Sequence, residues 1–372
     1  MTVQEIPLFK VHMPESVSRA LEPVLTSGRI ADGDQVRSFE AVLGQYLGNH
    51  RIVAMSDYSG SITLALFLAG VRPDDEVIVS PMICTGTTMP IANMFARPVW
   101  CDVDPMTGII DLKQVAPLIT RKTKALILYH WSGDVGDLDL ARELTNSHDL
   151  TLIEDASEAF GAEYKGKRLG SHGVDFTVFS FYAVKQITTV EGAALATSQD
   201  DSFEKARWLK RYGIHQPSFR TENGDLAENS DIPVAGYNFY MNNVAAAVGL
   251  EQMKSIDTLV ARYRDNGSFY DRELQGVQGL QVLQRRPDSA SGYWTYSFLA
   301  ESRDSLLKKL LAHGIRAQRL HVRNDRYTCF PPSTRQLPGV DYFDARNISI
   351  PCGWWVTEED RARVVDCIKS GW

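Results

Sequence analysis

Two short apolar segments each lead to a side chain that could do chemistry. Residues 151–153 and 176–181 have the length and the β-branched or aromatic content of buried strands. The first is followed by the acid pair Glu154-Asp155, and the second runs on toward Lys185. Parallel strands bury both of their faces, so a carboxylate or an amine just beyond such a strand is costly unless it has a task.

An amine and a carboxylate in this setting suit chemistry on pyridoxal phosphate. Burial lowers the pKa of a lysine amine and makes the amine nucleophilic enough to form a Schiff base with an aldehyde. A carboxylate opposite the pyridine nitrogen keeps that nitrogen protonated, so that the ring withdraws electrons. We expect Lys185 in the first role, Asp155 in the second, and the Ser180 hydroxyl on the cofactor phosphate. The alternative is a surface lysine and an aspartate that caps a helix.

The longer motif around these residues resembles that of a known family. It reads E-D-A-S-E-A-F-G-A-E-Y-K-G-K-x-x-G, followed by F-S-F-x-x-x-K-x-x-T-T-x-E-G. This is similar to the signature of the DegT/DnrJ/EryC1/StrS sugar aminotransferases, which are fold-type I pyridoxal-phosphate enzymes. The resemblance covers nearly the whole chain and is densest between residues 30 and 252. A sister branch that performs dehydration carries His at the position of Lys185, so the lysine favours amino transfer.

Composition narrows the classes of function. The chain of 372 residues carries a net charge of −7, which argues against partners such as nucleic acid or a membrane surface. Its five cysteines have no CxxC spacing, so we expect reduced thiols and neither disulfides nor a metal site. The start has no apolar leader, and no run of about 18 apolar residues occurs. These features predict a soluble, cytoplasmic protein.

The order of predicted elements indicates an α/β fold. Strands alternate with helices up to about residue 197, which predicts a large, mostly parallel sheet covered on both sides. The C-terminal part alternates short strands and helices. We therefore expect a fold-type I aminotransferase with a large cofactor-binding domain (1–255) and a smaller α+β domain (256–372). The predicted strands are 51–55, 76–80, 98–103, 125–129, 151–153, 176–181, 281–283 and 296–300. The predicted helices are 15–25, 36–46, 62–69, 111–118, 138–147, 202–213, one from about 242, 256–274, 305–313 and 358–370.

A turn of small residues between strand 51–55 and the next helix predicts an anion site. Backbone N–H groups at a helix N-terminus point outward, and the helix dipole favours negative charge there. In the family this turn holds the cofactor phosphate and usually reads S-G-T, which falls on Asp57-Tyr58-Ser59 here. Ser59 keeps a hydroxyl, whereas Tyr58 replaces a glycine. The alternative is an ordinary helix cap.

A second departure from the family falls on Cys84. The resemblance implies an aromatic residue there, stacked on the cofactor ring, but the sequence reads P-M-I-C-T-G. Either another side chain supplies the stack, or a small polarizable thiol lies against the ring. A plain buried cysteine is a further alternative.

The resemblance also implies a homodimer with its active sites at the subunit interface. The segment G-Y-N-F-Y-M resembles the family's G-Y-N-Y-R-M, whose Asn reaches the cofactor phosphate of the neighbouring subunit. Asn238 matches that Asn, whereas Tyr240 stands in place of the Arg. The polar stretch 215–234 before it is longer than a simple connection between two elements, and loops of this length are usually functional or disordered.

Substrate contacts are expected from two loops. The loop 28–33 lies near the active site in the family, which makes Arg29 and Asp32 candidates. The loop 321–327 gathers basic and polar groups, of which we single out His321, Arg323 and Asn324. A plain helix–loop–helix and a solvated loop explain these residues equally well.

The residue three positions after Asp155 bears on the position of amination. Relatives tend to carry Gln there when they aminate C3 of the sugar, and His or Glu when they aminate C4. Glu158 therefore predicts C4 amination, with its carboxylate orienting substrate or cofactor. The alternative is a solvent-facing Glu at the start of a helix.

The function predicted is amination of a nucleotide-linked 4-keto-6-deoxyhexose, with glutamate as donor, for surface polysaccharide such as O-antigen lipopolysaccharide. Three alternatives stay open. One is C3 amination, one is a pyridoxal-phosphate dehydratase or lyase, and one is a cofactor-binding regulator without enzymatic activity.

Overall fold

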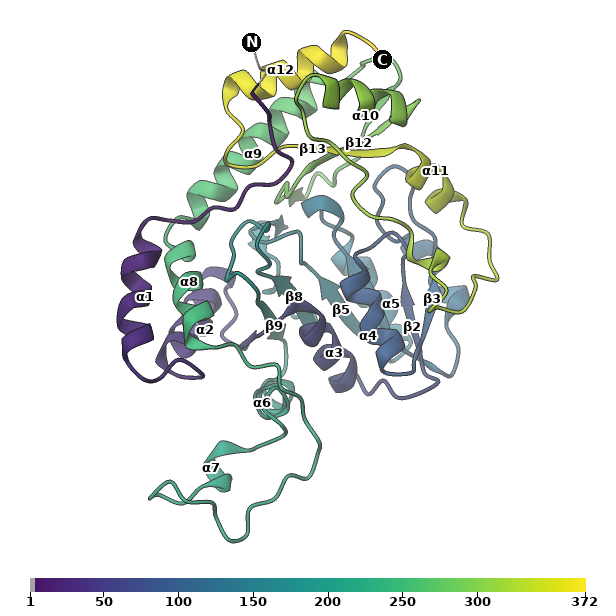
Figure 1. The fold of residues 1–372 in the computed structure, drawn as a ribbon. Coiled ribbons are helices and arrows are strands. Elements are labelled where there is room, and N and C mark those ends of the chain that lie inside the picture. Colours follow the sequence, from purple (N-terminus) through teal and green to yellow (C-terminus); the bar gives the residue numbers. More distant parts are fainter. Residues whose placement is uncertain (1–3) are drawn as a thin grey trace.

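A seven-stranded sheet forms the centre of the computed structural model, which describes residues 4–372 (Figure 1). The predicted large domain begins with residues 1–3, which lie outside this range. The strand order is β1-β9-β8-β5-β4-β2-β3. Five neighbouring strands are parallel, and β9 runs antiparallel to β1 and β8. The bounds are β1 Ile52–Met55, β2 Glu76–Val79, β3 Arg97–Trp100, β4 Thr123–Tyr129, β5 Thr151–Asp155, β8 Phe176–Ser180 and β9 Ala193–Thr197.

Helices pack on this sheet, which explains its apolar strands. Every residue of β8 and β9 is buried, as expected for strands covered on both faces. Helix α3 contacts β8, β9 and β1, and α5 contacts β4 and β5. Helices α1 and α2 pack on α8. The bounds are α1 Ser16–Thr26, α2 Asp34–Leu47, α3 Tyr58–Leu68, α4 Thr85–Asn93, α5 Leu138–Ser147, α6 Asp200–Leu209 and α8 Asn243–Met253.

The C-terminal part has its own sheet and its own apolar core. Strands β10, β12 and β13 form an antiparallel sheet, and the long helix α9 leads to it from the large sheet (Figure 1). Ile6 belongs to this second core, because its backbone pairs with Ile315. The domain boundary near residue 255 stays a prediction. The bounds are α9 Ile256–Glu273, β10 Leu280–Val282, β12 Tyr296–Ala300, α10 Arg303–Ala312, α11 Pro338–Arg346, β13 Asn347–Ile350 and α12 Glu358–Lys369.

A small third sheet joins the two halves of the chain. It has the order β11-β6-β7, with bounds Ser289–Ala290, Glu163–Tyr164 and Lys167–Arg168. Its strands are only two residues long, which is too short for a periodic pattern to reveal them in the sequence.

The α/β fold class predicted from the sequence is confirmed, and one predicted helix is wrong. The segment 111–118 forms two 3-10 turns, Leu112–Gln114 and Ala116–Leu118, in place of one α-helix. Pro117 has no backbone N–H and cannot continue a regular helix from the first turn. Helix α3 begins at Tyr58, four residues before its predicted start. Helices α4 and α11 and strand β13 were not predicted.

The polar stretch 215–234 forms an arm that projects from the body below α6 (Figure 1). It contains the short helix α7, Gln216–Phe219, and a bridge between Arg220 and Leu226. Three apolar side chains of the arm are at least two-fifths exposed, namely Leu226, Ile232 and Val234. Of the helices within residues 4–372, none has the length and apolar character needed to cross a membrane.

A buried ion-pair network ties α9 to the segment after β4. Arg285 donates to Asp134 at 2.8 Å and to Asp271. Asp271 also accepts from the hydroxyls of Tyr293 and Tyr296, at 2.7 and 2.9 Å. Only 17% of the Arg285 side chain is exposed, so water cannot replace these partners.

We expect Arg285→Ala to lower the free energy of unfolding by about 3 kcal/mol, because two carboxylates then lose their buried cation. The matched control is Arg37→Ala, whose pair with Asp34 lies on the surface with 66% of the arginine exposed. The control variant should change the free energy of unfolding by less than about 0.5 kcal/mol. Urea denaturation followed by circular dichroism measures both, and equal effects would contradict the buried network.

Candidate active site

The carboxyl ends of β5 and β8 bring the predicted catalytic residues together. These strands are parallel neighbours, with Asp155 the last residue of one and Ser180 the last of the other. Side chains just beyond such strands meet at one edge of the sheet. A cavity of about 350 Å³ lies there. Its lining consists of Asp57, Tyr58, Ser59, Cys84, Ser157, Glu158, Ser180, Tyr182, Val184, Lys185, Glu191, Trp294 and His321.

The Lys185 amine lies inside this cavity with 10% of its side chain exposed. Its Nζ is 3.6 Å from Glu158 Oε1 and 3.4 Å from the centre of the Trp294 ring. The Trp294 indole donates to the Val184 carbonyl at 2.7 Å and stacks on Phe9, so its ring is fixed in place. The alternative of a solvent-exposed lysine is wrong.

Glu158 is fully buried at the centre of a polar cluster, so the solvent-facing alternative is wrong. Its carboxylate accepts from the Tyr129 hydroxyl and from the Ser132 amide at 3.0 Å, and lies 2.9 Å from His321 Nε2. Burial alone would raise the pKa of Glu158. The charges of Lys185 and His321, together with the hydrogen bonds, hold that pKa below its usual value. Glu158 is therefore an anion that accepts hydrogen bonds.

Asp155 is also fully buried and lies behind the cavity wall. One oxygen accepts from the Ser157 amide at 3.1 Å, and the other from Thr87 at 2.8 Å and from the Tyr58 hydroxyl. Two carboxylate oxygens offer about four acceptor positions. Asp155 can therefore accept one more hydrogen bond, such as one from a pyridine nitrogen.

The N-terminus of α3 forms another wall of the cavity. Asp57 caps the helix and accepts from the Gly60 amide at 2.6 Å. Ser59 lines the cavity beside it, with its hydroxyl on the Gly86 carbonyl at 3.2 Å. The Tyr58 and Ser59 amides are the first two of the helix and have no intrahelical acceptor. This end of the cavity suits a phosphate, apart from the negative charge of Asp57.

The donor set of the cavity fits pyridoxal phosphate. An amine suited to bind an aldehyde and a helix N-terminus line a space of about 350 Å³. The Asp155 carboxylate, with one acceptor position left, lies behind the wall of this space and contacts Tyr58, which lines it. Ser180 lines the same space. Cys84 precedes the first residue of α4 and also lines the cavity. Burial raises the pKa of its thiol, so Cys84 stays protonated and contributes no charge.

Three predicted contact residues, Arg29, Asp32 and Asn238, do not line this cavity, and two of them contact Arg211. Asp32 pairs with Arg211 at 2.8 Å, and the backbone of Asn238 bridges to that of Arg211. Arg29 lies on the adjoining loop, where its carbonyl accepts from Asn243 at 2.8 Å. The side chains of Arg29 and Asn238 are exposed.

Of the three residues predicted from the loop 321–327, only His321 lines the cavity. The Arg323 guanidinium pairs with Asp325 and Asp341. The Asn324 amide is fully buried and donates to the carbonyls of Pro81 and Ile83, at 3.1 and 2.6 Å. Asn324 therefore holds the loop against the segment after β2, whereas Arg323 ties it to Asp341 of α11. The role of both residues in substrate binding stays a prediction.

Sequence reasoning missed Tyr129, Thr87 and Trp294. Tyr129 ends β4, the parallel neighbour of β5, so the rule that ligands bind at strand ends could have found it. Thr87 lies in the first turn of a helix that was not predicted. Trp294 comes from more than a hundred residues beyond Lys185, and no local pattern marks it.

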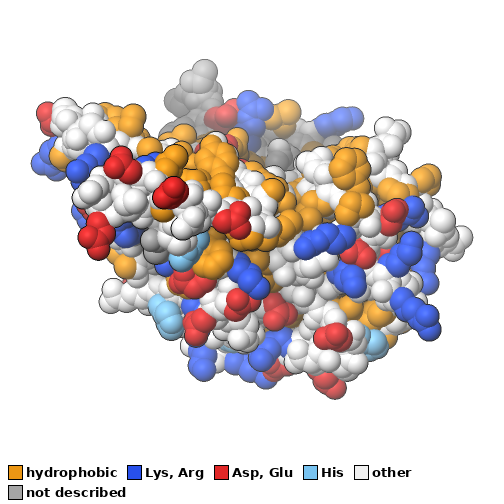
Figure 2. Space-filling view, turned by 90° about the horizontal axis from the view of Figure 1, so that it is seen from below, with side chains coloured by type: hydrophobic (Ala, Val, Ile, Leu, Met, Phe, Trp, Pro, Cys, Tyr) orange, Lys and Arg blue, Asp and Glu red, His pale blue; other side chains and the backbone are white. Residues whose placement is uncertain are grey.

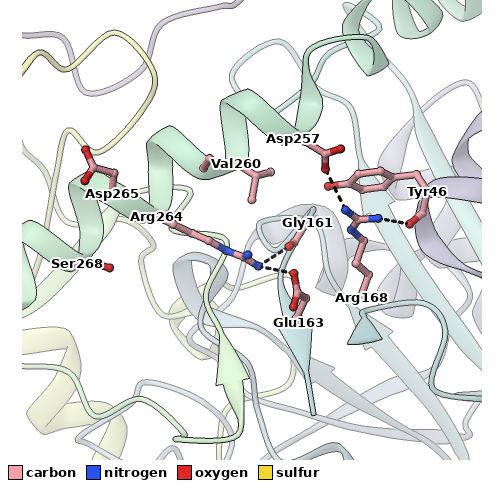
Figure 3. A pocket seen from close by; sticks show the side chains of 10 residues that line it. Tyr46, Gly161, Glu163, Arg168, Asp257, Val260, Arg264, Asp265 and Ser268 are labelled. Atoms are coloured by element: carbon pink, nitrogen blue, oxygen red, sulfur yellow. Dashed lines mark hydrogen bonds and ion pairs between the residues drawn. The ribbon is translucent and has the colours of Figure 1, made fainter. Parts of the chain in front are cut away.

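A second cavity, of about 430 Å³, lies between α9 and the third sheet (Figure 3). Arg168 donates to the Tyr46 carbonyl and pairs with Asp257 (Figure 3). Arg264 donates to the Gly161 carbonyl and pairs with Glu163. Each guanidinium group therefore has an acidic partner among the residues that line this cavity.

Several solved structures have the same fold as this chain. Sugar aminotransferase CalS13 from Micromonospora echinospora is 36% identical, with a TM-score of 0.93 over 99% of this chain and 100% of that one. AtS13 from Actinomadura melliaura is 35% identical, with a TM-score of 0.94 over the full length of both chains. DesV from S. venezuelae is 27% identical, with a TM-score of 0.88 over 95% and 94%.

A family model describes the chain as well. The model of the DegT/DnrJ/EryC1/StrS aminotransferase family matches residues 12–369, which is nearly the whole chain. The resemblance found in the sequence, the enzyme class and the fold-type I architecture are thereby confirmed, as is pyridoxal phosphate as the cofactor of such enzymes. The chain belongs to the DegT/DnrJ/EryC1/StrS aminotransferase family and is a pyridoxal-phosphate-dependent sugar aminotransferase.

Proposed function

We propose that this enzyme transfers an amino group from glutamate to C4 of a nucleotide-linked 4-keto-6-deoxyhexose. The observation that carries the proposal is the ion pair between Lys185 and the buried Glu158, 3.6 Å apart in one cavity. We further propose that the amino sugar serves the synthesis of a surface polysaccharide, such as O-antigen lipopolysaccharide, in the cytoplasm.

Each residue of the cavity has a distinct task in this reaction. When bound, pyridoxal phosphate carries the amino group from donor to acceptor and withdraws electrons from the carbon that loses its proton. Lys185 attaches the cofactor and, once released, moves that proton as general base and acid. Asp155 accepts a hydrogen bond from the pyridine nitrogen. Ser59, Ser180 and the first amides of α3 bind the phosphate.

Glu158 directs the acceptor sugar in this proposal. An ionised carboxylate only accepts hydrogen bonds, whereas the amide expected for C3 amination both donates and accepts. Glu158 therefore selects an acceptor that presents a hydroxyl, or a cofactor oxygen that carries a proton. His321 Nε2 lies 2.9 Å from the same carboxylate and His321 lines the cavity, so it holds Glu158 in position beside the sugar.

A homodimer would give the residues around Arg211 a role in the partner's active site. Arg29, Asp32 and Asn238 lie together outside the cavity of their own subunit. The arm that follows α6 carries exposed apolar side chains, and hydrophobic side chains gather between charged groups on the face seen in Figure 2. Burial of such groups against a second copy would stabilise a dimer.

We expect Lys185→Ala to abolish covalent cofactor attachment and turnover, because no other amine lines the cavity among residues 4–372. The measurement is borohydride reduction of the loaded enzyme, followed by mass spectrometry of peptides. The matched control is Lys210→Ala, which removes an equally buried amine that pairs with Glu40 outside the cavity. Cofactor trapped on another lysine of the Lys185→Ala variant would overturn the assignment.

The position of amination is tested with matched 3-keto and 4-keto nucleotide sugars plus glutamate. We expect the new amine at C4, located by NMR, with 2-oxoglutarate formed in equal amount. An amine found only at C3 would refute the role given to Glu158. Loss of water or of a carbon fragment without 2-oxoglutarate would refute amino transfer itself.

Mixed dimers test the contribution of Asn238 to the partner's site. Equal amounts of Lys185→Ala and Asn238→Ala subunits should exchange to about half heterodimers, each with one intact site, and so regain about a quarter of wild-type activity. The control mixes Lys185→Ala with the double variant Lys185→Ala/Asn238→Ala, which cannot form an intact site. No recovery, under conditions where subunits demonstrably exchange, would count against a shared site.

A further inference from the structure

The Tyr58 side chain lies at the junction between the cavity and Asp155. Its hydroxyl donates to Asp155 Oδ2, the oxygen that also accepts from Thr87, and lies 2.7 Å from the Thr87 hydroxyl. Burial raises the pKa of Tyr58 well above its usual value, and the charge of Asp155 raises it further. The phenol therefore keeps its proton and acts as a donor to Asp155.

The surroundings of the Tyr58 ring leave space for it and for little else. A Cβ added to Gly86 would lie 3.0 Å from two carbons of this ring, which is tighter than ordinary contact. Cys84, a small residue, lines the cavity on the same side. The first turn of α4 is thus shaped to accept an aromatic ring that comes from α3.

The other aromatic side chains of the cavity are placed differently. Trp294 stacks on Phe9 at a centroid distance of 5.0 Å and has Lys185 over its ring. Tyr182 is 48% exposed. Among the aromatic side chains that line the cavity, Tyr58 is the one that contacts Asp155.

We propose that Tyr58 is a positioning residue for the cofactor. Its hydroxyl fixes the Asp155 carboxylate, and its ring forms the aromatic wall on which the pyridine ring of pyridoxal phosphate packs. The inference rests on the proposed function for the presence of that cofactor. It also accounts for two departures in the sequence at once, because Tyr58 and Cys84 line the same cavity, and the aromatic ring then comes from α3 and not from position 84.

The first test measures cofactor affinity, by titrating apoenzyme with pyridoxal phosphate and following its visible absorbance. Loss of an aromatic contact in Tyr58→Gly should weaken binding about tenfold. Cys84→Phe should also weaken binding, because two rings then compete for one space. The double variant Tyr58→Gly/Cys84→Phe should bind more tightly than either single variant. Two results would contradict the role of the Tyr58 ring as the aromatic wall. One is wild-type affinity for pyridoxal phosphate in Tyr58→Gly, and the other is a double variant that binds no more tightly than the single variants.

The second test isolates the hydroxyl. Tyr58→Phe keeps the ring, so the affinity for pyridoxal phosphate should stay within about threefold of wild type. The visible band of the bound cofactor and its pH titration should shift, because Asp155 loses a donor. The matched control is Tyr164→Phe, which removes another tyrosine-to-aspartate contact, 3.5 Å from Asp137 and outside the cavity. An unchanged spectrum in Tyr58→Phe would overturn the hydroxyl's role.

The thermal stability of each apoenzyme variant shows whether the variant is folded. Uptake of pyridoxal phosphate by the wild type and by the Tyr58 variants then separates the proposed function from the role of Tyr58. Wild-type protein that takes up no pyridoxal phosphate would count against the proposed function. Uptake by the wild type, with Tyr58 variants that behave like it, would count against the inference alone.

Discussion

The structure of the candidate active site depends on burying three ionisable side chains in or next to one cavity. Asp155, Glu158 and Lys185 are each at least nine-tenths buried, and an unpaired buried charge is costly. Lys185 and Glu158 compensate each other, and the remaining oxygens of both carboxylates accept from hydroxyl and amide donors. The partners come from α3, from α4 and from the ends of β4 and β5, so the packing of these elements also pairs the buried charges.

The C-terminal part of the chain completes the site. His321 and Trp294 contact Glu158 and Lys185, although both come from beyond α9. The Arg285 network and the stack of Phe9 on Trp294 hold these segments against the large sheet. A change in how the smaller core packs would therefore alter the distance between Lys185 and its partners, even where no cavity residue changes.

The sequence predicted those parts of the site that local order determines. Asp155, Ser180 and Lys185 follow apolar strands, and parallel strands must bring their ends to one edge. The sequence did not predict which long-range partners these groups have. Asn324 was expected to bind substrate because its neighbours are polar, yet its amide satisfies two buried carbonyls. The helix expected over 111–118 has the right composition but is interrupted at Pro117. Local sequence patterns reflect the secondary-structure propensity of a segment. The burial and the hydrogen-bond partners of its side chains depend on residues that are distant in the sequence.

The two residues that depart from the family pattern, Tyr58 and Cys84, are best explained together, because they line the same cavity. Considered alone, Tyr58 in place of a glycine suggests that the turn no longer binds the cofactor phosphate. Considered alone, Cys84 in place of an aromatic residue suggests that no side chain stacks on the cofactor ring. In the structure both residues line one cavity, and Gly86 leaves the space that the Tyr58 ring fills. Close packing makes such positions interdependent, because volume removed from one side of a cavity is available to a side chain from the other. The hydroxyl that comes with this ring donates to Asp155, the carboxylate that we propose for the pyridine nitrogen. A change in the source of an aromatic wall can therefore also change the hydrogen bonding of a neighbouring buried carboxylate, and both effects then follow from a single substitution.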